Sequence, residues 1–149
     1  MPQPAHFEPG KSIEVACAVV GPSGATLRID SSGTPVDGIT VEIPAGALAR
    51  DVTVKLSYDT GTLTLTKGQA SGVYLRVSAE SVKEFREPIR INIRFDPVRW
   101  KGYAVAGYGV DAQGRLEAVD AGPKDYDKGV ASFTTLVPLL FTWVYAETR

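Results

Sequence analysis

Histidine and cysteine, the residues behind most acid–base and nucleophilic mechanisms, each occur once in these 149 residues. His6 lies in a proline-rich N-terminal stretch, which offers no rigid support for a Ser-His-Asp site. Cys17 falls on the apolar face of an alternating segment, so the pattern predicts a buried and unreactive thiol. One cysteine and one histidine do not make a structural zinc site. The sequence therefore predicts a non-enzymatic protein without a cofactor.

An acidic stretch near the C-terminal end, DAGPKDYDKG, is the best candidate for a metal site. Carboxylate oxygens grouped on one loop are the ligands that Ca²⁺ prefers. The stretch departs from the EF-hand pattern, because Gly129 stands where Asp or Asn belongs, and Lys124 opposes a dication. A solvated acidic loop is the first interpretation and a calcium site is the alternative. The candidate ligands are Asp120, Asp125 and Asp127.

Two further sets of residues are candidates for binding. Arginines on the outward positions of predicted strands could form a basic stripe, or could simply be solvated and offset nearby glutamates. Aromatic residues close together in sequence could stack on a sugar or fill a pocket of a partner, or could pack into the core. The arginines are Arg76, Arg90 and Arg94, and the aromatic residues are Trp100, Tyr103 and Tyr108.

Bulk composition describes an ordinary globular chain. Hydrophobic residues make up 44% and charged residues 22%, and the formal net charge is −1. No overall field favours nucleic acid, so no nucleic-acid partner is expected. No apolar run approaches the roughly 20 residues of a membrane span, and no signal peptide is visible after Met1. Neither the compartment nor the oligomeric state follows from these numbers.

Alternation of apolar and polar residues predicts about ten short strands separated by turn signals, and therefore an all-β antiparallel β-sandwich. The organising stretch is residues 38–48, an alternating segment that ends at Pro44 and leads into one short helical turn near residues 45–49; alternation resumes at Val52, Val54 and Leu56. Residues 1–12 hold three prolines and are expected to be a flexible arm, followed by one domain over residues 13–149. In the first strand, the residues expected to point inward are Ile13, Val15, Cys17 and Val19.

The stretch Ile43-Pro44-Ala45-Gly46-Ala47-Leu48, with the strands around it, resembles the ZU-five domain, named for zonula-occludens and netrin-receptor proteins and also found in ankyrins. Residues 87–97, with a strand ending in Phe-Asp-Pro, and residues 130–146 are similar to later strands of bacterial surface-protein relatives. The resemblance is close over residues 38–56 and looser over about 20–146. It implies a β-sandwich that serves as a protein-interaction or structural module, in the cell envelope or outside the cell.

Two alternatives accompany this hypothesis. One is a carbohydrate-binding module that uses the aromatic residues near Trp100, with a glycan as its partner. The other is a self-processing domain, since some relatives cleave themselves between Phe and Ser of a His-Phe-Ser tripeptide. The matching residues here are Leu140, Phe141 and Thr142, and Leu cannot move a proton. An intact chain with a structural Thr142 is therefore expected.

Overall fold

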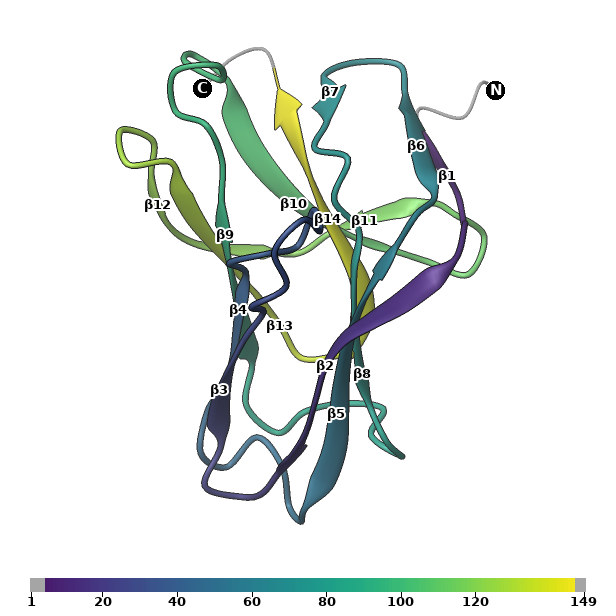
Figure 1. Ribbon diagram of the computed structural model, residues 1–149, viewed down its shortest axis with the longest axis vertical. Helices are drawn as coiled ribbons and strands as arrows, with labels where there is room; N and C mark the ends of the chain where they lie inside the picture. The colour runs from purple at the N-terminus through teal and green to yellow at the C-terminus, as the bar shows by residue number, and fades with distance from the viewer. Residues whose placement is uncertain (1–4, 147–149) are drawn as a thin grey trace.

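The computed structural model describes residues 5–146, which form fourteen strands in three antiparallel sheets (Figure 1). The larger sheet runs β11 (Leu116–Ala118), β10 (Ala104–Val110), β14 (Leu139–Ala146), β8 (Leu75–Ala79), β5 (Val52–Asp59), β2 (Ser12–Val20), with β7 (Gln69–Ala70) also on β14. The second sheet runs β12 (Asp120–Asp125), β13 (Val130–Thr135), β9 (Ile89–Arg94), β4 (Thr40–Ile43), β3 (Ala25–Arg28). The third pairs β1 (Ala5–Glu8) with β6 (Thr62–Leu65).

The two larger sheets face each other across the main core, so the predicted all-β sandwich is confirmed. Figure 1 shows β3, β4 and β9 on the left and β2, β5 and β8 on the right. On strands that keep one register the inward residues alternate as the sequence predicts, for example Val41 and Ile43 on β4 and Ile89, Ile91 and Ile93 on β9, all at most 2% exposed. Over residues 5–146 the structure contains no helix of the length and apolar character that a membrane crossing requires.

A second, smaller core lies on the outer face of the seven-stranded sheet, beneath the β1–β6 ribbon. Phe7 of β1 and Leu63 of β6 pack there on outward side chains of β14 and on Tyr74, which directly precedes β8. The Phe7 and Tyr74 rings lie 4.8 Å apart, and the Phe7 amide donates to the carbonyl oxygen of Gly114 at 2.8 Å. Burial raises the pKa of the Tyr74 hydroxyl, which accepts a hydrogen bond from the Leu63 amide.

With the ribbon over its outer face, β14 is buried on both faces. Phe141, Trp143 and Tyr145 point into the main core, while Leu140 and Val144 point into the second core. This separation of faces agrees with the alternation read from the sequence. Its two edges are paired as well, with β10 on one side and β8 and β7 on the other.

The structure differs from the expected N-terminal arm. Residues 1–4 lie outside the described part of the chain, but Ala5–Glu8 is a strand that pairs with β6 in register from Ala5↔Leu65 to Glu8↔Thr62. Phe7 is 3% exposed, so this segment contributes a buried side chain. Its proline content did not prevent pairing, because the four paired residues themselves contain no proline.

The predicted face of the first strand is wrong beyond its first residues. A bulge between Glu14 and Ala16 shifts the register of β2 on β5 by one residue. Because side chains alternate with a period of two, this shift sends Cys17 and Val19 outward and Ala16 and Ala18 inward. Cys17 is consequently exposed, whereas the alternation had predicted a buried thiol.

Two local predictions also need correction. Residues 45–49 form no helical turn; Pro44–Ala47 is a tight turn in which the Ala47 amide donates to the Pro44 carbonyl oxygen and Gly46 has φ of 86°. Leu48, which follows this turn, is buried at 3% exposed. The expected acidic loop after residue 119 instead begins with the edge strand β12.

Candidate functional site

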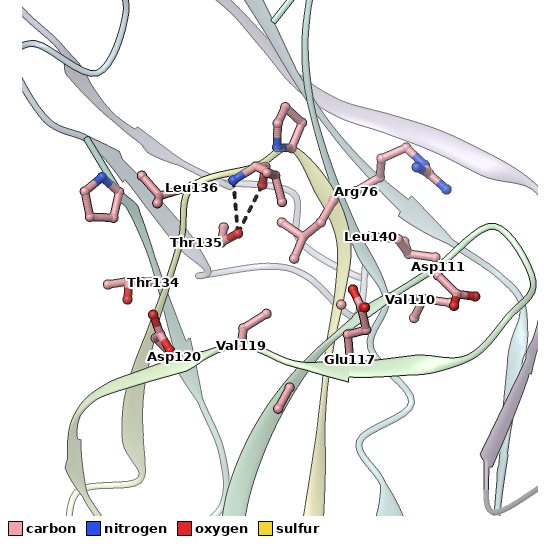
Figure 2. A pocket seen from close by; sticks show the side chains of 16 residues that line it. Arg76, Val110, Asp111, Glu117, Val119, Asp120, Thr134, Thr135, Leu136 and Leu140 are labelled. Atoms are coloured by element: carbon pink, nitrogen blue, oxygen red, sulfur yellow. Dashed lines mark hydrogen bonds between the residues drawn. The ribbon is translucent and has the colours of Figure 1, made fainter. Parts of the chain in front are cut away.

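A hollow in the described chain lies where residues 134–140 approach residues 117–120, and we call it the end pocket. It has a volume of about 480 Å³. Figure 2 shows Thr135 at the end of β13 and Leu136 on the turn to β14, with Glu117, Val119 and Asp120 on the chain that passes from β11 to β12 across the hollow. The pocket therefore lies where the chain crosses between the two sheets at two places.

The apolar wall of the end pocket is the turn that joins β13 to β14. Leu136 is 45% exposed and Val137 is 42% exposed, although both are aliphatic. The Thr135 hydroxyl holds the turn by hydrogen bonds with the amide and carbonyl of Val137, both 3.2 Å (Figure 2). The Leu136 carbonyl oxygen accepts a hydrogen bond from the Phe85 amide at 2.6 Å. These contacts hold the two aliphatic side chains at the surface on a fixed backbone.

The opposite rim is acidic and carries Asp111, Glu117 and Asp120. Asp111 is engaged within its own hairpin turn, where its carboxylate accepts hydrogen bonds from the Arg115 and Gln113 amides and from Arg115 Nε at 3.1 Å. The backbone amide of Arg115 is the main cause that lowers the pKa of Asp111, against a smaller effect of desolvation. The arrangement can hold an apolar group against the turn and a cationic group at the rim.

The aromatic candidates near Trp100 do not come together as one platform. The Trp100 ring stacks on Tyr145 with centroids 3.8 Å apart and an interplanar angle of 6°, and the Arg99 guanidinium lies 5.1 Å from its centroid. Tyr103 packs edge-on against Trp100, whereas Tyr108 lies beside the second core. Burial raises the pKa of the Tyr145 hydroxyl. One face of the Trp100 ring is thus already occupied by the protein itself.

The three candidate arginines lie on two different sheets. Arg90 and Arg94 are on the outward face of β9, while Arg76 is on β8 and lines the end pocket. Alternation identifies an outward position but does not say to which sheet a strand belongs. Because β8 and β9 belong to different sheets, the three arginines do not form a single stripe, and the two on β9 line a separate hollow.

The three candidate metal ligands are also separated. Asp120 and Asp125 stand at opposite ends of β12, and the Asp125 carboxylate accepts hydrogen bonds from the Asp127 and Lys128 amides. Among the residues that the structure describes, no three His, Cys, Asp or Glu side chains come together as metal ligands. The position of Asp125 is explained by its capping of the turn before β13.

The segment compared with the self-cleaving tripeptide is a packed strand. Thr142 is fully buried and its hydroxyl donates to the Val73 carbonyl oxygen at 2.7 Å, with Ser71 Oγ 3.4 Å away. Leu140 lies in the second core, and His6 contacts Glu8 at 2.8 Å on the ribbon. The hydroxyl of Thr142 thus has a structural hydrogen bond of its own.

The sequence reasoning missed Leu136 and Val137, which form the apolar wall. The available signal was the run Leu136-Val137-Pro138 between two strands, where turn residues would ordinarily be polar. Comparison with models of known protein families gives no match for this chain, and comparison with curated proteins gives none. The interpretation of the site therefore depends on its own geometry.

Proposed function

We propose that this chain is a non-enzymatic β-sandwich interaction module of the ZU-five type, which binds a segment of a partner protein in the end pocket. The observation that carries the proposal is the exposure of Leu136 and Val137, 45% and 42%, at the wall of a hollow of about 480 Å³. Adjacent exposed aliphatic residues with a polar rim are typical of interaction sites. The resemblance around residues 38–56 supports the same class of function and suggests a place at the cell surface or envelope.

The two sides of the end pocket define the chemistry of the partner segment. The turn side offers aliphatic contact from Leu136 and Val137, and the strand side offers the carboxylates of Glu117 and Asp120. A partner segment with an aliphatic side chain next to a lysine or arginine would satisfy both sides. The contacts of Thr142 and His6 described above support a non-enzymatic reading, because each polar group already has a partner within the fold.

Site-specific photocrosslinking tests the proposal. A benzophenone amino acid replaces Val137 in the full chain, which is then irradiated in an extract of the cells that produce it. We expect one dominant crosslinked protein, and an excess of unlabelled wild-type chain should suppress the crosslink. An excess of the L136E chain should fail to suppress it, because a carboxylate would enter the apolar wall next to the acidic rim.

The matched control carries the benzophenone at Val98, which is 83% exposed on a different loop and does not line the end pocket. This control should give no competed product. Equal crosslinking from both positions, or equal competition by wild-type and L136E chains, would show that the end pocket is not the binding site. A hydrolytic activity that is lost in T142V but kept in L136E would overturn the non-enzymatic class itself.

A further inference from the structure

A second hollow, of about 330 Å³, lies on the outward face of the five-stranded sheet, and we call it the basic groove. Its floor is formed by β9 and β13, one side by Gly38 and Thr40, and the other by Pro123. Arg90 and Arg94 project from the floor. The volume is at the lower end of the range for ligand sites, about 300–1,000 Å³.

A bulge in β12 builds one wall of the basic groove. The pairing of β12 with β13 shifts register between Ala121 and Lys124, which places Gly122 and Pro123 against β13. The Ser132 hydroxyl donates to the Pro123 carbonyl oxygen at 3.1 Å and is largely buried. A Cβ at Gly122 would lie 2.6 Å from Ser132 Oγ, so a larger residue there would displace the hydroxyl that bonds Pro123. The wall is a defined part of the fold rather than a mobile loop.

Among the described residues, neither arginine of the basic groove is held in an ion pair, although the carboxylate of Glu42 lies opposite Arg90. In the part of the chain that the structure describes, the guanidinium groups of Arg90 and Arg94 form no ion pair or hydrogen bond. The nearest carboxylate in register is Glu42, opposite Arg90, and it accepts a hydrogen bond from Asn92 Nδ2 at 2.7 Å. Asn92 also donates to Thr40 Oγ1 at 2.9 Å. Both arginines therefore remain available for an external anion.

The spacing of the two arginines favours a ligand with repeated charges. They are four residues apart on one face of an extended strand, which corresponds to about 13 Å between their Cα atoms. A third arginine, Arg28, lies on the same face at the edge strand β3, across Thr40 from Asn92. Cations distributed over this distance suit an extended polyanion better than one small ion.

The surroundings distinguish between kinds of polyanion. Every floor strand of the basic groove is paired on both sides, so its backbone offers no free groups for an extended acidic peptide. The described outward side chains of β3, β4, β9 and β13 include no aromatic ring on which a nucleic-acid base could stack. They do include the polar side chains of Thr40 and Asn92, which line the groove and suit a ligand rich in hydroxyl groups.

From this geometry we propose that the basic groove binds an acidic polysaccharide, with its sulfate or carboxylate groups on Arg90 and Arg94 and its hydroxyls on the polar side chains between them. This site is independent of the end pocket and of the proposed function there. Binding would anchor the module to an anionic polymer and leave the end pocket open to its protein partner, because the residues that line the two hollows do not overlap.

Isothermal titration of the full chain with dextran sulfate tests the proposal, with uncharged dextran of the same length as the matched ligand. We expect saturable binding of dextran sulfate alone, with an affinity that falls as salt rises. The R90Q/R94Q variant should bind about tenfold to thirtyfold more weakly, as expected from removal of two cations that contact a polyanion. The R50Q/R86Q variant has the same change in charge on exposed loops elsewhere and should bind like the wild type.

Circular dichroism and thermal melting serve as the check that both variants fold. Equal affinity of the wild type and R90Q/R94Q for dextran sulfate would overturn the proposal, as would equal weakening in R50Q/R86Q, which would indicate an effect of net charge alone. Tighter binding of poly-glutamate or single-stranded DNA than of dextran sulfate would assign the basic groove to another class of polymer. These readouts do not involve Leu136 or Val137, so their failure leaves the proposal for the end pocket standing.

Discussion

Replacement of Phe7 by alanine removes the main contact between the β1–β6 ribbon and the seven-stranded sheet. Full burial of a phenylalanine side chain stabilises by about 1.5–3 kcal/mol, and an aromatic pair such as Phe7–Tyr74 adds about 0.5–1.5 kcal/mol. Phe7 is only 3% exposed, and the centroid of its ring is 4.8 Å from that of Tyr74, so both contributions apply. We expect F7A to lower the free energy of unfolding by about 2–4 kcal/mol.

Urea denaturation followed by far-ultraviolet circular dichroism measures this loss, and the melting temperature should fall by several degrees. The stability that F7A can lose is limited to the free energy with which the β1–β6 ribbon docks on the seven-stranded sheet, because β1 can detach while the rest of the domain stays folded. Hydrogen exchange at the Phe7 amide, which is bonded to the Gly114 carbonyl, reports that detachment directly. In F7A this amide should exchange much faster than amides of β9.

The matched control is V19A, since Val19 is also apolar and on a strand but is 69% exposed. It should change the free energy of unfolding by less than about 0.5 kcal/mol. A loss below about 1 kcal/mol in F7A, together with unchanged exchange at the Phe7 amide, would refute the second core as a source of stability. The N-terminal arm that the sequence predicted over residues 1–12 would then be dispensable for folding.

Three further predictions concern single side chains. T142V removes the donor to the Val73 carbonyl oxygen and should cost about 1–3 kcal/mol in urea melts, while the intact mass of the wild type stays unchanged after days at neutral pH. D111N should remove a pH dependence of stability. Because folding lowers the pKa of Asp111, its carboxylate stabilises the folded wild type at pH values above the ordinary pKa of Asp, and this stabilisation is lost as pH falls through the folded-state pKa. The melting temperatures of wild type and D111N should therefore converge in acid. G46A should cost about 1–2 kcal/mol in thermal melts through backbone strain alone, because φ is 86° and a Cβ would have room; no loss would mean a different turn.

Alternation was sufficient to predict the sandwich and most of its inward residues. It worked wherever a strand kept one register, as on β4, β5 and β9, because burial of one face fixes the period. It failed on β2, where the bulge between Glu14 and Ala16 adds one residue and reverses the faces. Nothing in the run Glu14-Val15-Ala16 marks a bulge, since it contains neither glycine nor proline.

The sites were less predictable than the fold, because each depends on contacts between distant parts of the chain. Tyr74 reads as an outward residue of its strand, and only the docking of Phe7, 67 positions earlier, makes it buried. Arg76 and Arg90 both read as outward, but they belong to different sheets. The end pocket likewise arises where residues 117–120 and residues 134–140 approach each other, which no local pattern encodes.

The central position of β14 has a consequence for the order in which a ribosome presents the chain. Residues 139–146 are made after all the other strands, yet they lie between β10 on one side and β8 and β7 on the other and fill both cores. Until they emerge, β10 and β11 have no partner that joins them to the rest of the larger sheet. A nascent chain that ends before residue 139 would therefore present two open apolar faces and unpaired strand edges, which chaperones and proteases recognise. Folding of this domain is expected to wait for its last strand, so that products of interrupted translation are removed rather than accumulated as partly folded modules.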